Sequence, residues 1–211
     1  MGRGLAVRAL RHGIPVCIGS RAAEKAQAVA AQQRREIAGA EVIGASIVAA
    51  AEAGELLAVT VPFAAQLETL RAIREAARGK IVLDATVPLV PPRVARVQLP
   101  PEGSAAVRAQ KELGADVRVV SALHTVAAAR LESDAGAEEI GDVLVFGDDK
   151  ASRDTVVALL ARMNLAALHG GSLANSAAAE AFTSVLIFLN KHYDADHAGL
   201  RVTGIGKRQP V

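Results

Sequence analysis

Short apolar runs and longer amphipathic segments alternate along most of the chain. The apolar runs predict strands at 15–19, 41–43, 56–61, 80–84, 117–122, 142–146 and 165–168. The segments between them predict helices at 3–12, 22–36, 46–53, 64–77, 104–113, 151–162 and 175–191. Apolar runs without alternation are typical of strands covered on both faces. The pattern therefore predicts an α/β fold with a doubly wound, Rossmann-like parallel sheet and a small C-terminal helical part.

Two segments depart from this regular alternation. Residues 87–103 are rich in proline, so we expect a long surface loop that serves a site or contacts a neighbour. The segment 175–191 is apolar on much of its circumference. A helix of that kind is expected to be buried, and a second subunit would supply the cover.

Composition narrows the class of protein. Hydrophobic residues make up 51% of the chain but aromatic residues only 2%, and the formal net charge is +2. The nearly balanced charge and the scarcity of aromatic side chains on which bases could stack argue against nucleic-acid binding. No window approaches the roughly 18 uninterrupted apolar residues of a membrane span, and Met1-Gly2-Arg3 does not open a signal peptide. With Cys17 as the one cysteine, we expect a soluble cytoplasmic protein without a membrane partner.

The stretch from Val16 to Arg21 carries the first candidate chemistry. An apolar strand stops at Gly19-Ser20-Arg21, and a helix with Lys25 in its first turn follows. In a dinucleotide-binding βαβ unit this position faces the adenosine ribose, where cationic residues suit the 2′-phosphate of NADP. The alternative is a helix capped by Ser20 and followed by two solvated cations.

The usual beginning of a Rossmann unit is missing from the sequence. Such a unit starts with a strand and a Gly-x-Gly-x-x-Gly loop, whereas this chain starts at the first helix. Gly2 stands where the third glycine would be. The absent strand is the central one of the sheet. Three explanations are open: roughly ten further residues lie upstream of Met1, the chain is shortened, or another strand from this chain or a partner fills the gap.

A series of motifs in one order resembles the NADPH-dependent F420 reductases (F420H2:NADP oxidoreductases). The most specific are Glu-Gly-Ser-Ala-Ala at 102–106 and Ser-Ala-Leu-His-Thr at 121–125. The others are Gly-Arg-Gly-Leu-Ala at 2–6, Ile-Gly-Ser-Arg at 18–21, Val-Thr-Val-Pro-Phe at 59–63, Val-Pro-Leu-Val at 87–90, Ala-Ala-Arg at 128–130, Gly-Asp-Asp at 147–149, Ala-Asn-Ser at 174–176 and His-Ala-Gly-Leu-Arg-Val-Thr-Gly at 197–204.

This resemblance implies a dinucleotide-binding domain over 1–122 and a C-terminal α/β part over 123–211, which contributes to a deazaflavin cleft and a homodimer contact. It implies NADP as cofactor and coenzyme F420 as co-substrate. The implied NADP-binding residues are Gly2, Ser20, Arg21, Lys25, Val61, Pro62, Val87 and Ala128. The chain departs from the family pattern at position 127, where Ala replaces a frequent Pro, and in the incomplete phosphate loop.

The expected reaction is hydride transfer between NADP(H) and the deazaflavin, which needs positioned rings rather than a protein nucleophile. We therefore expect no catalytic side chain and no metal. His124 follows a predicted strand at the end where ligands of open α/β sheets bind. Two interpretations of it are open: it contacts the deazaflavin or orients its loop, or it is satisfied by local backbone. Asp148-Asp149 is expected to cap helix 151–162 rather than bind metal.

Two other functions are compatible with the sequence. One is an NADPH-dependent reductase with a different acceptor, such as a flavin, a ferric ion or an imine. The other is a shortened, non-catalytic relative that dimerises or regulates, and the missing strand keeps this possibility open.

Overall fold

The computed structural model describes residues 1–133 and 135–205. Nine α-helices are seen in these residues: α1 Gly2–Arg11, α2 Ala23–Glu36, α3 Ile47–Ala53, α4 Gln66–Ile73, α5 Ala105–Leu113, α6 Ala128–Glu132, α7 Ala137–Ile140, α8 Lys150–Arg162 and α9 Ser176–Tyr193. The strands are β1 Val16–Ser20, β2 Val42–Ser46, β3 Leu56–Val59, β4 Ile81–Asp84, β5 Arg118–Ser121, β6 Asp142–Gly147 and β7 Ala166–Gly171. Two 3-10 turns, η1 Phe63–Ala65 and η2 Leu173–Asn175, precede α4 and α9.

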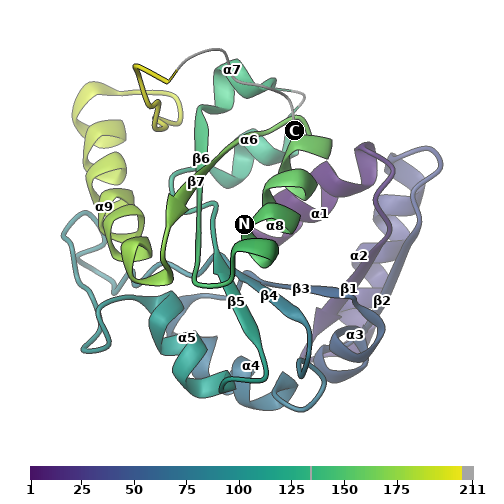
Figure 1. The fold of residues 1–211 in the computed structure, drawn as a ribbon. Helices are drawn as coiled ribbons and strands as arrows, with labels where there is room; N and C mark the ends of the chain where they lie inside the picture. The colour runs from purple at the N-terminus through teal and green to yellow at the C-terminus, as the bar shows by residue number, and fades with distance from the viewer. Residues whose placement is uncertain (134, 206–211) are drawn as a thin grey trace.

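The strands form two sheets instead of one. β1 and β2 make a parallel pair, and β3-β4-β5-β6-β7 make a five-stranded sheet. All neighbours in the larger sheet are parallel except β5 and β6, which are antiparallel. In Figure 1, β3 lies between β4 and β1, so the interruption falls between β1 and β3. The expected doubly wound α/β fold is thus confirmed, with its sheet divided at that point.

The expectation that all strands are covered on both faces is wrong next to this interruption. Every residue of β4 is buried, as the apolar pattern predicts. No residue of β1 is fully buried, and Ala58 in β3 is exposed. The physical reason is that, among residues 1–133 and 135–205, β1 and β3 each have a paired strand on one side only.

Helix starts follow local capping chemistry. Ser104 Oγ accepts from Val107 N at 3.0 Å and opens α5, and Asp149 Oδ2 accepts from Ser152 N at 2.7 Å and opens α8. The prediction that the Asp148-Asp149 pair caps this helix is confirmed for Asp149. The cap interpretation of Ser20 is wrong, because α2 starts after Ala22.

Helix α9 is less buried than its apolar sequence predicts. It leaves Val185 and Phe188 exposed by 38% and 51%. The segment Leu173–Tyr193 is also long and apolar enough to cross a membrane by length and composition alone. It carries the buried polar residues Ser176 and Glu180, which bond to the region around the start of α5. We therefore describe it as a helix of the folded domain.

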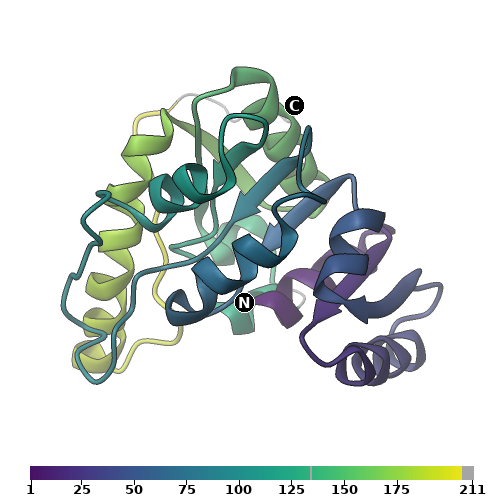
Figure 2. The same cartoon turned by 90° about the horizontal axis from the view of Figure 1, so that it is seen from below.

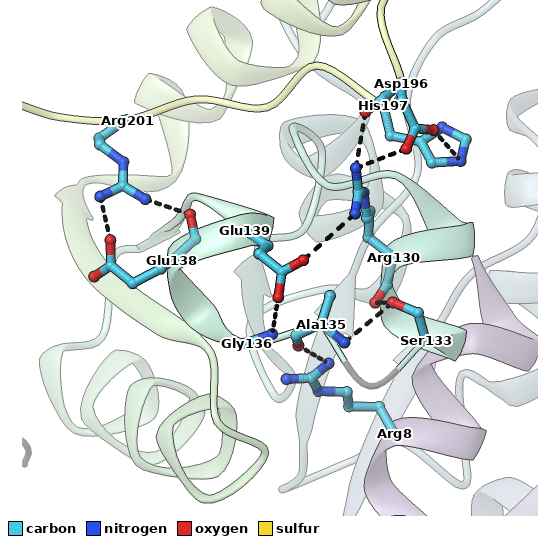
Figure 3. A network of polar contacts seen from close by, with 10 residues as sticks. All are labelled: Arg8, Arg130, Ser133, Ala135, Gly136, Glu138, Glu139, Asp196, His197 and Arg201. Atoms are coloured by element: carbon cyan, nitrogen blue, oxygen red, sulfur yellow. Dashed lines mark hydrogen bonds and ion pairs between the residues drawn. The ribbon is translucent and has the colours of Figure 1, made fainter.

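The segment that follows α9 makes polar contacts with α6 and α7, as Figure 3 shows. Arg130 of α6 bonds to Asp196 at 3.0 Å and lies 3.9 Å from Glu139. Arg201 pairs with Glu138 at 2.6 Å. The sequence pattern did not predict these two short helices, because each is shorter than two turns and is held by tertiary ion pairs.

Candidate functional site

The first turn of α1 meets the loops that follow the strands of the larger sheet. A Cβ atom added to Gly2 would lie 2.6 Å from Thr60 Oγ1, and one added to Gly4 would lie 2.5 Å from the carbonyl oxygen of Ala128. Only glycine allows this approach. Because Thr60 follows β3 directly, the N-terminus of α1 lies at the carboxyl end of the sheet, where nucleotides bind to folds of this kind.

The cationic residues of the sequence prediction stand at the start of α2. Ser20 Oγ accepts a hydrogen bond from Ala22 N at 3.3 Å. The Arg21 side chain is 75% exposed, and its Nη1 lies 4.0 Å from Glu68 Oε2 in α4. Lys25 is exposed in the first turn of α2. A 4.0 Å pair between exposed side chains is weak, so the Arg21 guanidinium can reorient toward an anion.

The other predicted nucleotide residues lie in the loops at the carboxyl ends of the strands. Val61 and Pro62 follow β3, and Pro62 opens η1. Val87 follows β4, and Ala128 begins α6. Val61, Val87 and Ala128 are partly buried, whereas Pro62 is exposed. Their apolar character suits contact with a nicotinamide ring, because a ring buried there needs no charged partner.

His124 sits in the buried loop after β5. Its side chain is 4% exposed, and its Nε2 lies 2.9 Å from Ser121 Oγ. Nδ1 is buried and has no hydrogen-bond partner among the described residues. Burial lowers the pKa of His124 to about 4, so the ring is neutral near pH 7. A neutral imidazole with one unsatisfied nitrogen can exchange a hydrogen bond with a ligand but carries no charge toward it.

The backbone around His124 is held in an unusual conformation. Leu123, which is 1% exposed, has a φ of 74°, in the left-handed region that bulky residues rarely adopt. The hydroxyl of Thr183 in α9 donates to the His124 carbonyl at 2.8 Å. Strained backbone persists only where the surroundings fix it, and such positions cluster at functional sites. The interpretation that local contacts alone satisfy His124 accounts for Nε2 but leaves Nδ1 unexplained.

A buried polar network beside this loop was missed at the sequence level. Asp84 accepts hydrogen bonds from Gln66 Nε2 at 2.5 Å and from Thr86 N at 3.0 Å. Arg108 donates to Gln66 Oε1 at 2.9 and 2.7 Å, and its guanidinium lies 3.8 Å above the ring of Phe63. Burial raises the pKa of Asp84 to about 6. The hydrogen bonds from Thr86 and Gln66 and the charge of Arg108 act in the opposite direction and lower it.

Glu180 completes this network from α9. It is 1% exposed and accepts hydrogen bonds from Ala105 N at 2.6 Å and Ala106 N at 3.1 Å. Burial raises its pKa to about 7, and the negative charge of Asp84 adds to the shift. The sequence did carry a signal for each residue. Glu180 is a charged residue within an apolar helix, and Asp84 is a charged residue at the end of an apolar strand.

The remaining histidines expected at the surface are His12, His169, His192 and His197, and all are exposed. Within residues 1–133 and 135–205, no group of three or more His, Cys, Asp or Glu side chains could hold a metal ion.

Comparison with known proteins identifies the family. The chain is 34% identical to the F420-dependent NADP reductase of Methanocaldococcus jannaschii over 213 residues, which cover 97% of this chain and 94% of that protein. It is 37% identical to the protein of the same name from Methanothermobacter marburgensis, with the same coverage. The chain belongs to the F420-dependent NADP reductase family. The family model described as NADP oxidoreductase, coenzyme F420-dependent, matches residues 1–88.

Solved structures support the same fold. A crystal structure named as a candidate F420-dependent NADP reductase from Arthrobacter sp. FB24 aligns with a TM-score of 0.82 and 24% identity. The alignment covers 96% of this chain and 94% of that one. An imine reductase from Streptomyces aurantiacus aligns with a TM-score of 0.60 and 21% identity, covering 92% of this chain and 60% of that one. At these identities the likeness concerns the fold alone.

Proposed function

We propose that this protein transfers a hydride between NADP(H) and coenzyme F420. The observation that carries the proposal is full-length similarity to F420-dependent NADP reductases, at 34–37% identity. The fold agrees with this proposal. The loops that contain Val61 and Val87, and the cationic residues Arg21 and Lys25, follow the carboxyl ends of strands, where nucleotides bind to folds of this kind. The predicted oxidoreductase class is thereby confirmed.

In this proposal Ser20, Arg21 and Lys25 bind the 2′-phosphate of NADP. A hydroxyl, a planar guanidinium and an ammonium at the N-terminus of a 14-residue helix offer hydrogen bonds and positive charge to a dianion. The first turn of α1 has no side-chain cap among the described residues, so its backbone N–H groups can donate to the dinucleotide phosphates. Gly2 is needed there because a side chain would contact Thr60. The nicotinamide ring then lies against the loops that contain Val61, Pro62, Val87 and Ala128.

The two coenzymes, when bound, supply the hydride donor and acceptor. The residues of the chain position the rings and keep water away from them, which is where the rate enhancement of such a reaction arises. We assign to His124 a hydrogen bond to the deazaflavin through its unsatisfied Nδ1. Thr183 and Ser121 fix the orientation of that loop. No side chain is assigned as a nucleophile or as an acid-base catalyst.

We further propose a cytoplasmic homodimer whose contact includes α9. Its exposed apolar residues Val185 and Phe188 lie one helical turn apart. Val97 and Leu99 of the proline-rich loop are also exposed, by 45% and 42%. Exposed apolar side chains on this helix and this loop support a contact with a second protein chain. The proposed division into residues 1–122 and 123–211 places α9 in the second part and the proline-rich loop in the first. Residues 134 and 206–211 of the second part lie outside the described structure.

A direct assay tests the function. Mixing the protein with NADPH and F420 is expected to bleach F420 absorbance, and NADH is expected to be much less effective. Loss of NADPH with a flavin, a ferric ion or an imine while F420 is untouched would overturn the acceptor and favour a different reductase. Absence of any NADPH binding by fluorescence titration would favour the non-catalytic relative.

A further inference from the structure

The imidazole of His124 carries one proton, on one of its two ring nitrogens. Burial lowers its pKa to about 4, so the ring is neutral near pH 7 and has one N–H donor and one acceptor nitrogen. Nε2 lies 2.9 Å from Ser121 Oγ, whereas Nδ1 is buried and has no partner among the described residues. The direction of the hydrogen bond at Nε2 therefore decides what Nδ1 presents.

The hydroxyl of Ser121 has His124 Nε2 as its partner. Ser121 is 0% exposed, so bulk water does not reach this hydroxyl. The buried carboxyl group of Asp84 stands in register with Ser121 across β4 and β5. Its two oxygens accept from Thr86 N at 3.0 Å and from Gln66 Nε2 at 2.5 Å. Within the described part of the chain, no hydrogen bond joins Asp84 to Ser121, and Nε2 remains as the acceptor for the hydroxyl proton.

The two positions of the ring proton differ in how many buried groups they leave without a partner. If the Ser121 hydroxyl donates to Nε2, the ring proton is on Nδ1, and only this N–H lacks a partner. If Nε2–H donates to Ser121, both the hydroxyl proton and the Nδ1 lone pair lack one. Each buried polar group without a hydrogen bond costs free energy, so the first arrangement is the more stable.

We propose that Ser121 is a positioning residue that holds His124 in the Nδ1–H tautomer, so that the loop after β5 offers a ligand one neutral hydrogen-bond donor. The ligand group that fits is a carbonyl oxygen of a heterocycle. A carboxylate or phosphate would lose its hydration there and gain no opposing charge, and an N–H group would face a second donor. The choice of the deazaflavin as the source of the carbonyl rests on the function proposed above.

The direction of this donor is set before a ligand binds. β4 and β5 are parallel and in register up to their last residues, so the loops that follow them begin side by side. One loop contains Val87 and the other contains His124. The second loop is held by the left-handed backbone of Leu123 and by the hydroxyl of Thr183, which donates to the His124 carbonyl at 2.8 Å. A donor fixed in this way loses little freedom when it meets an acceptor.

The loop lies apart from the cationic residues proposed for the 2′-phosphate. Figures 1 and 2 both place α9 (yellow-green) and α2 (purple) at opposite sides of the larger sheet. Thr183 ties the His124 loop to α9, whereas Arg21 and Lys25 stand at the start of α2. This separation favours a reacting ring, rather than the adenosine end of the dinucleotide, as the neighbour of His124.

Long-range ¹H–¹⁵N NMR of the imidazole rings tests the tautomer without any coenzyme. The signals of His124 are identified by their loss in His124→Gln. Near pH 7, Nδ1 is expected to resonate as a protonated nitrogen and Nε2 as an unprotonated one, with the Nδ1–H form in about tenfold excess or more. Equal amounts of the two forms, or an excess of the Nε2–H form, would overturn the proposal.

Ser121→Ala tests the source of this preference. It removes the hydroxyl that donates to Nε2, and the ratio of the Nδ1–H form to the Nε2–H form is expected to fall about tenfold. Ser184→Ala is the control, because Ser184 is also buried, at 3% exposure, and has no hydrogen bond to His124 among the described residues. An unchanged ratio in Ser121→Ala, or an equal change in both variants, would overturn the role of Ser121. The spectrum of the parent protein decides the tautomer whether or not the variant folds.

Separate titrations with F420 and with NADPH identify the source of the carbonyl. The deazaflavin carries carbonyl oxygens on its ring, and nicotinamide carries one in its carboxamide. Each coenzyme is added alone, so no hydride is transferred. F420 is expected to move the Nδ1 proton signal of His124 downfield, and NADPH is expected to leave it in place. An equal or larger shift with NADPH would overturn the deazaflavin as the ligand of this N–H, and no shift with either coenzyme would overturn a ligand role for Nδ1.

The F420 absorbance assay distinguishes failure of this role from failure of the proposed function. If Nδ1 carries the proton and Ser121→Ala shifts the ratio, but NADPH does not reduce F420, the positioning role of Ser121 stands and the proposed function fails. If F420 is reduced while Nε2 carries the proton, the function stands and the role of Ser121 is overturned.

Discussion

Glu180 of α9 closes the N-terminus of helix α5, because its Oε2 accepts a hydrogen bond from Ala105 N at 2.6 Å. The same carboxyl group accepts from Ala106 N at 3.1 Å. It therefore satisfies two of the backbone donors that a helix start leaves free. Since Thr183 on the same helix holds the His124 loop, Glu180 links the position of α9 to the proposed deazaflavin site.

Removal of this carboxyl group is expected to destabilise the protein. Glu180→Ala leaves two buried N–H groups without acceptors, and we expect a loss of about 2–4 kcal/mol in the free energy of unfolding, measured in urea. Glu180→Gln keeps one acceptor oxygen, so its free energy of unfolding should decrease less than that of Glu180→Ala. Glu75→Gln is the control, because its parent side chain is 82% exposed, and it should change stability by less than about 0.5 kcal/mol. Equal effects of Glu180→Ala and Glu75→Gln would refute the role of this contact.

The stability of the fold should fall as the pH rises through neutrality. The pKa of Glu180 is raised to about 7 and that of Asp84 to about 6, both by burial. A raised carboxyl pKa means that the folded state holds protons which the unfolded state has released. Its stabilising contribution is complete below pH about 4 and is lost as the pH rises through about 7. For Glu180 the loss amounts to up to about 3 kcal/mol.

Urea unfolding at pH values from 5 to 8 checks this direction. Glu180→Gln cannot titrate, so its stability should decline less over the same range than that of the parent protein. A parent protein whose stability rises between pH 6 and 8, or a variant with the same slope as the parent, would contradict the assignment.

His124 should remain neutral well below its ordinary range. Its pKa is lowered to about 4 by burial, so its neutral form contributes stability above pH 6.5, and this contribution is lost as the pH falls toward 4. NMR of the ¹⁵N-labelled imidazole ring measures the midpoint. A midpoint near 6.5 for His124 would mean that the ring is solvated.

Arg21 should discriminate NADPH from NADH. Loss of a charge-assisted contact to the 2′-phosphate costs about 1.5–3 kcal/mol, so Arg21→Ala is expected to weaken NADPH binding roughly 10- to 100-fold and to leave NADH unchanged. Arg35→Ala, which removes an exposed cation from the last turn of α2, is the control. Equal weakening for both nucleotides would remove Arg21 from the phosphate site.

Gly4 should tolerate no side chain, although alanine favours helices. A Cβ there would lie 2.5 Å from the Ala128 carbonyl oxygen and 3.1 Å from Leu131 Cβ. We expect Gly4→Ala to lower the melting temperature, with a loss of about 1–3 kcal/mol. Gly136→Ala is the matched control, because nothing lies within 4 Å of its added Cβ. A stabilised Gly4→Ala would show that α1 approaches α6 less closely than described.

The sequence predicted the long, regular elements well. Apolar runs predicted the strands that contain Val82 and Val120, and both of these side chains are fully buried. Local capping chemistry correctly predicted the role of Asp149. These features depend on residues near one another in the chain, so periodicity and composition report them directly.

The site was predicted less completely. The motif around Ser121 to Thr125 led to His124, but its bond to Ser121 and the left-handed Leu123 depend on the fold. Asp84 and Glu180 are 96 positions apart in the numbering, and their electrostatic coupling has no local sequence signature. α6 and α7 are likewise too short to be recognised from periodicity.

By itself, the sequence determined the α/β class and the order of the long elements, because hydrophobic periodicity is a local property. Only the tertiary structure decided that Ala58 is exposed in β3, that α9 leaves Phe188 exposed, and that Glu180 caps α5. Each of these depends on which distant segment packs against a residue, and burial and hydrogen bonding across the chain are fixed only when the fold is assembled.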